Sequence, residues 1–447
     1  MKRASRSRRD SNTGGTVQTT TRGQRQSQTT PTQMMSMIHG AQAGLHTRGE
    51  FQREVRAAVL NKLPGVLREK EFPCQKWKEF DKGFACEWLN TETVVVGTKC
   101  NKLLCLNTIT NQFQRVAMPR APPRPPGAPQ PNPEAPPGGC GIHSIALSPD
   151  RRLLATGGAN PSDCQILAVR DDACSAATPK APLLEPVQTL VGHMDWVFGT
   201  AWVTDRHVVT GSRDQHLKLW KVDTEPNSSP NMHPLVSQMP TLTSARDEKN
   251  YKVRDVKYNR NMGRLASLTT NGCVQFWDPH ATFERNVRLK HSKEVVCLAM
   301  NDSLLAVGSQ SHITLVDPRK KTPVQDVESL DEGHGVRSLN FLDHLLSAGS
   351  GRGRLFFYDM RASAYLDLDI AAEQPHLGSS MAVDRGCLQC GTGYLNQTDT
   401  VYLEHFSGEQ VFNACYSHAW DPTRTRLAAV GGPLAYGLRG SYMAVWN

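Results

Sequence analysis

Three residues in one stretch of the chain have the side chains of a serine hydrolase. Ser212 could supply the nucleophilic hydroxyl, His193 the general base and Asp214 the orienting carboxylate. A second candidate is the Cys-x-x-Cys pair Cys387 and Cys390, which could bind zinc or act as a redox couple. No other cysteine or histidine pair stands at metal-ligand spacing, and the sequence has neither a P-loop nor a dinucleotide-binding glycine motif. The role of these residues therefore depends on the elements that hold them.

Those elements are repeats. Each copy has a short apolar strand, a turn, a second strand ending in Gly followed by Ser, Thr or Gly, and a third strand ending in an aromatic residue or Asp. Seven copies begin near Phe84, Ile142, Gly192, Val253, Val295, Val336 and Cys415. Together with their Gly-His and aromatic-Asp marks, they predict an all-β protein, a seven-bladed β-propeller of WD-repeat type.

The repeat changes the interpretation of the hydrolase-like residues. In a blade of this type we expect Ser212, His193 and Asp214 to form a buried hydrogen-bonded tetrad with Trp220, which ties a loop to the blade. This interpretation is favoured over a catalytic triad, and one isolated Cys-x-x-Cys pair is weak evidence for a metal. The sequence therefore predicts a protein that is not an enzyme and has no cofactor and no metal.

The N-terminal part of the chain precedes the first repeat. Apolar residues recur at helical spacing from Glu50 to Lys70, and Pro64 interrupts them, so we expect two short amphipathic helices there. The last repeat stops after its third strand, at Asn447. We expect the segment from Glu71 to Phe80 to supply its fourth strand, which would close the ring and remove an exposed sheet edge.

Most of the positive charge lies in a tail. The formal net charge is +9, but residues 1–50 hold eight Lys or Arg and two Asp or Glu, which leaves 43 cations and 40 acids elsewhere. Residues 1–49 are poor in aliphatic side chains, so we expect a disordered tail. Its cation cluster from Lys2 to Arg9 is either simply solvated or a nuclear-import or polyanion-binding patch. The other expected divisions are a propeller over 71–447, a Pro-rich loop at 119–139 and a long insertion at 365–410.

The chain also gives indications of its environment. No apolar run approaches the roughly 18 residues that span a bilayer, so we expect no membrane partner. The twelve cysteines are scattered in apolar contexts, which favours a reducing compartment over a disulfide framework.

Equivalent positions in different blades lie on the same face of a propeller. Near the start of the inner strands these positions hold Phe84, His143, Phe198, Arg254, Val296, Arg337 and Tyr416. With the turn residues Lys99 and Arg213, and Lys252 just before its strand, five cations (Lys99, Arg213, Lys252, Arg254 and Arg337) should meet at one mouth of the channel. None of these register positions holds an acid. Clustered cations in a concave mouth favour a dense anion, and we expect an acidic C-terminal peptide.

On the opposite rim, the third strands of two repeat copies end in the same short motif. Asp317 and Arg319 in the fifth copy, and Asp359 and Arg361 in the sixth, share the spacing Asp-x-Arg. Each pair could be a local ion pair worth less than about 1 kcal/mol. Because the two blades are adjacent, the pairs could equally form a docking site.

Several short sequence segments resemble those of one known family. The strand ends resemble the WDxR box of WD-repeat substrate receptors for the damaged-DNA-binding adaptor of cullin-4 RING ubiquitin ligases. Residues 97–101 (GTKCN), 139–149 (GCGIHSIALSP) and the C-terminal GGPLAYGLRGSYMAVWN are similar to the adaptor-and-cullin-4-associated factor 12 family. The resemblance covers roughly residues 50–447.

The resemblance implies a non-catalytic receptor that selects proteins for ubiquitination by acidic C-terminal degrons ending in glutamates. It places the basic pocket on the same five cations of the mouth, the adaptor-binding helices between Phe51 and Lys70, and the box arginines at Arg319 and Arg361. His280 replaces the box arginine in the fourth copy, so we expect no docking there. Expected partners are the adaptor, the cullin-4 RING complex and substrate proteins, in nucleus and cytoplasm.

Two alternatives remain open from the residues alone. One is a nuclear RNA- or chromatin-associated scaffold that binds polyanions through the basic tail, although the nearly balanced propeller makes nucleic acid the less favoured partner. The other is a general propeller platform for protein assembly. The sequence does not name the substrates or an oligomeric state.

Overall fold

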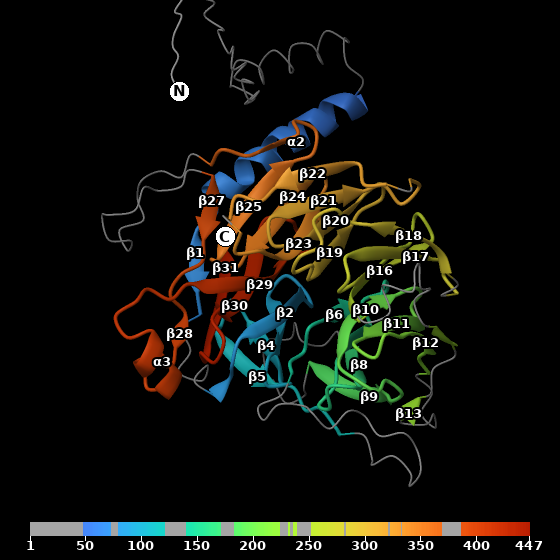
Figure 1. The fold of residues 1–447 in the computed structure, drawn as a ribbon, viewed down its shortest axis with the longest axis horizontal. Coiled ribbons are helices and arrows are strands. Elements are labelled where there is room, and N and C mark those ends of the chain that lie inside the picture. The colour runs from blue at the N-terminus through green and yellow to red at the C-terminus, as the bar shows by residue number, and fades with distance from the viewer. Residues whose placement is uncertain are drawn as a thin grey trace, which may run out of the picture. The chain divides into compact units, whose positions relative to one another are not determined.

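The computed structural model describes residues 48–72, 79–120, 140–170, 183–223, 231–232, 236–238, 252–280, 283–320, 322–331, 333–368 and 386–447. Within residues 52–447 the strands form seven sheets of four or five strands each (Figure 1). This arrangement confirms the predicted all-β, seven-bladed propeller.

The first three blades hold the strands from β2 to β14. Blade 1 contains β2 (Gly83–Trp88), β3 (Thr93–Thr98), β4 (Leu103–Asn107) and β5 (Gln112–Arg115). Blade 2 contains β6 (Ile145–Leu147), β7 (Leu153–Gly157), β8 (Cys164–Val169), β9 (Leu184–Leu190) and the parallel β13 (Asn231–Met232). Blade 3 contains β10 (Val197–Trp202), β11 (His207–Ser212), β12 (Leu217–Lys221) and β14 (Val236–Gln238).

The remaining blades follow in chain order. Blade 4 contains β15 (Val253–Asn259), β16 (Arg264–Thr269), β17 (Cys273–Trp277) and β18 (Phe283–Arg288). Blade 5 contains β19 (Cys297–Met300), β20 (Leu305–Gly308), β21 (His312–Val316) and β22 (Gln325–Glu328). Blade 6 contains β23 (Val336–Leu342), β24 (Leu345–Ser350), β25 (Arg354–Asp359), β26 (Ala364–Tyr365) and β27 (Cys387–Gln389). Blade 7 contains β29 (Asn413–Trp420), β30 (Leu427–Pro433), β31 (Gly440–Trp446), β1 (Glu69–Glu71) and β28 (Tyr394–Leu395).

The inner strands of the blades form a closed ring. β2, β6, β10, β15, β19 and β23 contact one another in chain order, and β29 contacts both β23 and β2. Each middle strand is almost wholly buried because it packs against both neighbouring blades; Val94, Val95 and Val96 of β3 are 0% exposed. The packing of sheet on sheet therefore sets the geometry of the channel.

Blade 7 is closed by a strand from the N-terminal part of the propeller. β1 pairs antiparallel with β31, with Glu69 opposite Trp446 and Glu71 opposite Ala444. The expected closure is therefore present, but the prediction of Glu71 to Phe80 was wrong in position. The buried side chains of Leu67 and Phe72 flank β1 and fix it two residues earlier; residues 73–78 lie outside the described part of the chain.

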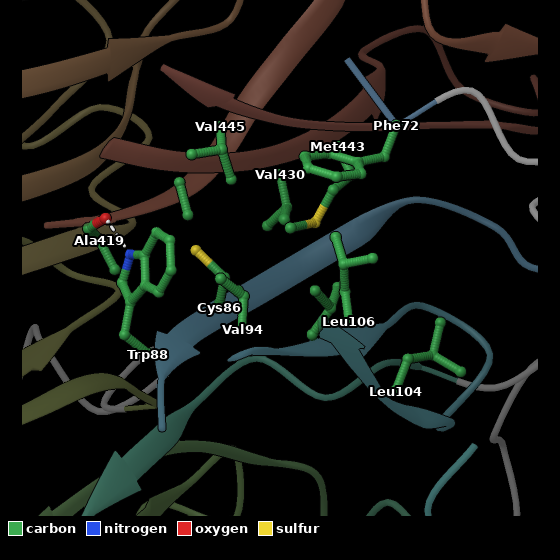
Figure 2. Close-up of a cluster of buried hydrophobic side chains, with 12 residues drawn as sticks. Phe72, Cys86, Trp88, Val94, Leu104, Leu106, Ala419, Val430, Met443 and Val445 are labelled. Atoms are coloured by element: carbon green, nitrogen blue, oxygen red, sulfur yellow. Dashed lines mark hydrogen bonds between the residues drawn. The ribbon is translucent and has the colours of Figure 1, made fainter. Parts of the chain in front are cut away.

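A hydrophobic cluster joins the first and last blades. Figure 2 shows Trp88 of blade 1 beside Ala419 of blade 7, and Phe72 beside Met443, in one cluster that also includes Leu104 and Val430. The indole Nε1 of Trp88 donates a 2.9 Å hydrogen bond to the backbone oxygen of Ala419 across this boundary. Ring closure thus rests on apolar burial as well as on strand pairing.

One helix stands where two were expected. α2 runs without interruption over Arg48–Val66, with Pro64 in its last turn. A proline there removes only one hydrogen bond, two residues before the helix ends, so it does not divide the helix. Leu60 and Leu63 pack on Leu342, Leu345 and Trp420 of blades 6 and 7. No helix in the described part of the chain is long and apolar enough to cross a membrane.

The predicted insertion 365–410 contributes to two sheets. β27 pairs with β25, and β28 pairs with β31, so both complete outer edges of blades. α3 (Thr400–His405) follows, capped by the carboxylate of Asp399. Most of the predicted disordered tail (residues 1–47) and of the Pro-rich loop (residues 121–139), together with residues 369–385 of the insertion, lie outside the described part of the chain.

Candidate functional site

A cavity of about 880 Å³ opens among the inner strands. All seven equivalent residues near the starts of these strands line it, one from each blade: Phe84, His143, Phe198, Arg254, Val296, Arg337 and Tyr416. The prediction that these register positions meet around one channel is confirmed. We call the end of the channel at these residues the mouth.

Four rings form an aromatic collar around part of the mouth. Phe84 stacks on His143 with centroids 4.7 Å apart, and the edges of Tyr416 and Phe198 complete the row. Burial raises the pKa of Tyr416 to about 12 and lowers the pKa of His143 to about 3. Because the His143 Nε2–H donates to the Cys140 carbonyl at 2.8 Å, the neutral ring keeps Nδ1 as an acceptor. The collar is thus aromatic and uncharged near neutral pH.

Arg254 adds a charge to the end of this row. The carbon of its guanidinium lies 4.4 Å from the centroid of the Phe198 ring, a cation–π contact. Burial lowers its pKa, and the charge of Asp255 opposes that shift. Among the residues that the structure describes, no carboxylate forms an ion pair with Arg254, so its guanidinium is available to an anionic ligand.

Lys99 and Arg337 also line the cavity, but each is paired with an acid. Lys99 Nζ lies 2.7 Å from Asp81 Oδ2, and Arg337 Nη2 lies 2.8 Å from Glu294 Oε2. The expectation of an acid-free mouth was therefore incomplete. The sequence argument considered selected register positions, whereas these acids come from the loops just before the inner strands.

Arg213 and Lys252 are not among the residues that line the cavity. Arg213 lies 3.4 Å from Asp195 and stacks over Trp196 at 4.8 Å. Trp196 in turn contacts the Phe198 ring edge-on, which connects Arg213 to the collar. Lys252 lies directly before β15, and its carbonyl accepts a hydrogen bond from Thr270 N. Three of the five predicted cations thus meet in the cavity.

Lys82 is a cavity residue that the sequence analysis missed. It precedes β2 as Lys252 precedes β15, so comparison of that position across all blades would have found it. Its ammonium donates to the Ala435 carbonyl at 3.3 Å. Burial and the nearby Lys99 lower its pKa to about 8, against the opposing charge of Asp81.

The opposite rim holds both Asp-x-Arg pairs. Arg319 donates from Nε and Nη2 to the two carboxylate oxygens of Asp317, at 2.9 and 3.0 Å, with 74% of its side chain exposed. Arg361 donates from Nη2 to Asp359 at 3.4 Å. Asp359 also accepts from Asn61 Nδ2 of α2 at 2.9 Å. α2 is therefore held directly at the blade 6 pair of this rim.

The hydrolase-like residues form a structural tetrad, but the hydroxyl differs from the expected one. His193 Nδ1 contacts Asp214 Oδ2 at 2.8 Å, and Nε2 contacts Thr210 Oγ1 at 2.7 Å. Trp220 Nε1 donates to the same Thr210 oxygen at 2.8 Å. Ser212 instead donates to the Asp195 carbonyl, so it is not the tetrad hydroxyl. His193 bonds a threonine that is 0% exposed, which is no nucleophile for a substrate.

The Cys-x-x-Cys pair lies in hydrophobic surroundings. Cys387 and Cys390 are both buried, and Cys390 packs in one cluster with Cys415, Tyr442 and Leu388. Burial raises the pKa of the Cys390 thiol well above its usual value. Across the described ranges no group of three or more His, Cys, Asp or Glu is placed to hold a metal ion.

Comparison with known proteins identifies the propeller. The family model described as "DDB1- and CUL4-associated factor 12 beta propeller" matches residues 63–447. Curated relatives include a "Ribosome biogenesis protein WDR12 homolog" of Anopheles gambiae, 26% identical over 47% of this chain and 49% of the relative. Another of the same name from Culex quinquefasciatus is 24% identical over 31% of each chain. The chain thus spans at most about half the length of these relatives.

Proposed function

Because the chain belongs to the family of the DDB1- and CUL4-associated factor 12 beta propeller, we propose that it is a substrate receptor of a cullin-4 ubiquitin ligase. One face of the propeller binds the adaptor DDB1, and the mouth on the other face binds acidic C-terminal ends of substrate proteins. The receptor performs no bond chemistry. It tethers a lysine-bearing substrate near the charged conjugating enzyme and so raises the effective concentration.

The observation that carries the substrate site is the environment of Arg254. Its guanidinium lies against Phe198 at the wall of a concave cavity, with no carboxylate partner in the described part of the chain. A peptide carboxylate can accept two parallel hydrogen bonds from such a group. Lys82, Lys99 and Arg337 line the same cavity and extend the positive field to a second and third carboxylate.

The adaptor surface is supported by α2 and the blade 6 strand end. Asn61 joins α2 to Asp359, and Val59 and Val66 of α2 are 55% and 63% exposed. Large apolar side chains that are exposed on a helix already held by its other face are suited to a protein partner. Arg319 and Arg361 would contribute charged contacts at the same rim.

Peptide binding tests the substrate site. A fluorescent peptide that ends in two glutamates should bind the full chain in a polarisation assay. Arg254→Glu should abolish that binding and Lys252→Glu, next to the cavity but not in its lining, should weaken it, while Lys221→Glu, an exposed cation of β12, should leave it unchanged. The Arg254→Glu protein should still co-purify with DDB1. Unchanged peptide affinity in Arg254→Glu would contradict the assignment, as would equal binding of a peptide whose terminal carboxyl groups are amidated.

A second candidate is an RNA- or chromatin-associated scaffold. The cations of residues 1–49 and the partial similarity to proteins named for ribosome biogenesis support it. Polyanion binding should weaken steeply with salt and disappear when residues 1–49 are deleted, whereas peptide binding should survive that deletion. Imaging of the tagged chain with and without these residues would also test the proposed distribution between nucleus and cytoplasm.

A further inference from the structure

Glu294 occupies a position where two other blades carry lysines. Val296 is the residue of blade 5 that lines the channel, equivalent to Phe84 in blade 1 and Arg254 in blade 4. Two residues before each of these stand Glu294, Lys82 and Lys252, respectively. Blade 5 therefore carries a carboxylate in a position that is cationic in blades 1 and 4; Glu294 is not itself a lining residue of the cavity, but Arg337, to which it is paired, is one.

This carboxylate holds a cation of the neighbouring blade. Glu294 Oε2 accepts a 2.8 Å hydrogen bond from Arg337 Nη2, which also donates to the His334 carbonyl at 3.1 Å. Arg337 Nε, the other donor on this edge of the guanidinium, is buried and has no partner among the residues that the structure describes. The side-on fork of Arg337 is thus only half satisfied, whereas a carboxylate approaching in its plane accepts from both nitrogens.

The geometry keeps Arg337 at the cavity wall. Gly335 has φ +89°, and a Cβ on it would lie 3.0 Å from Arg337 Nη2, so the absence of a side chain leaves room for the guanidinium. The charge of Arg337 also disfavours the charged form of Arg254. In the empty receptor the Glu294 carboxylate offsets this repulsion between two arginines in one low-dielectric wall.

The Glu294 side chain is held less firmly than that of Asp81, the acid that pairs with Lys99. Asp81, which pairs with Lys99, also accepts hydrogen bonds from the backbone nitrogens of Lys82 and Gly440, and its side chain is 16% exposed. The Glu294 side chain is 44% exposed, and within the described residues its carboxylate binds Arg337 alone. Glu294 can therefore swing away from the mouth without breaking the backbone structure, and Asp81 cannot.

We propose that Glu294 is a resident competitor for the substrate carboxylate: it occupies Arg337 in the empty receptor and must release it when an acidic chain end binds. This inference rests on the proposed function of the mouth. Its consequence is that the native receptor binds acidic ends more weakly than its cations would allow.

A double-mutant cycle on the full chain tests this inference. Glu294→Gln should tighten binding of the peptide ending in two glutamates roughly two- to fivefold, the range expected for loss of a partly exposed ion pair. In an Arg337→Ala background the same substitution should bring no gain. Glu185→Gln is the matched control, because it removes the acid of the Arg170–Glu185 pair of blade 2, where both side chains are about 40% exposed.

Three results would overturn the inference. A weaker affinity of Glu294→Gln would mean that Glu294 positions Arg337 for the ligand, and an unchanged affinity would mean that Glu294 does not compete with the ligand. An equal gain with and without Arg337 would mean that Glu294 acts only by long-range repulsion. If the unaltered receptor binds no acidic peptide at all, the proposed function of the mouth fails and the inference fails with it; peptide binding with no effect of Glu294→Gln rejects the inference alone.

Discussion

Asn61 of α2 and Asp359 of blade 6 are joined by a 2.9 Å hydrogen bond from Nδ2 to Oδ2. Asp359 is 3% exposed, and its other oxygen accepts from the backbone nitrogens of Arg361 and Ala362. These hydrogen bonds hold the pKa of Asp359 below its usual value, against the opposing effect of burial. One carboxylate therefore fixes both the strand end and the helix of the adaptor face.

Asp359→Ala should destabilise the propeller by about 2 kcal/mol, because it leaves several donors without an acceptor. Asp317→Ala is the matched control in blade 5, where the carboxylate binds only Arg319 in the described structure, and should cost less than half as much. Urea unfolding followed by tryptophan fluorescence measures both. Equal costs would show that the link to α2 contributes nothing to stability.

Arg319→Ala combined with Arg361→Ala should reduce co-purification with DDB1 and leave the unfolding midpoint almost unchanged. Both side chains are at least half exposed, and exposed ion pairs contribute less than about 1 kcal/mol. The mouth variant Arg254→Glu serves as the reciprocal control and should retain DDB1. Full recovery of DDB1 with the double variant would mean that the two pairs are only local.

Thr210→Val should cost about 2–3 kcal/mol of stability, since it removes the buried hydroxyl that both Trp220 Nε1 and His193 Nε2 contact. Ser212→Ala should cost about 1 kcal/mol, because that hydroxyl contacts only backbone groups. Thermal or urea unfolding distinguishes the two. A larger loss of stability for Ser212→Ala than for Thr210→Val would indicate that Ser212 supplies the tetrad hydroxyl.

Glu69 should make the closure of the ring sensitive to pH. Burial raises its pKa to about 7, although Tyr442 Oη and Gly391 N donate to its Oε1. The folded state therefore keeps a proton that the unfolded state releases near pH 4.5, so this stabilisation is full below pH 4.5 and is lost as pH rises through about 7.

Glu69→Gln removes that titration and keeps an acceptor oxygen. The variant should match the parent near pH 4 and exceed its stability by about 1–3 kcal/mol near pH 8. Urea unfolding of both proteins across this range gives the difference, in which the titration of other groups cancels. A difference that does not change with pH would contradict the shifted pKa of Glu69.

The ring and its lining could be predicted because they depend on local periodicity. Each inner strand carries the same alternation, so the seven channel residues from Phe84 to Tyr416 could be placed by counting from the strand starts. The position of β1 could not be obtained this way, since Glu69–Glu71 has no apolar pattern of its own. Its register depends on Leu67 and Phe72, which flank it and enter cores formed by distant strands.

The charge balance of the mouth was harder to predict for a different reason. Glu294 and Asp81 lie in loops, and their pairing with Arg337 and Lys99 depends on how those loops fold over the rim. The contact of His193 with Thr210 rather than Ser212 was also hard to predict, because it depends on the orientation of the His193 ring. Composition and spacing identify the residue types in such sites but not which members of a type meet.

The pairing of β1 with β31 also determines when this protein can finish folding. Glu69 of β1 lies opposite Trp446 of β31. β1 is synthesised first, so it cannot pair until β31 has been synthesised. At about 5–20 residues per second this interval lasts tens of seconds. During it the edge of β1 lacks β31 and the apolar side chain of Phe72 lacks the blade 7 part of its core, so both are exposed to unwanted pairing and aggregation.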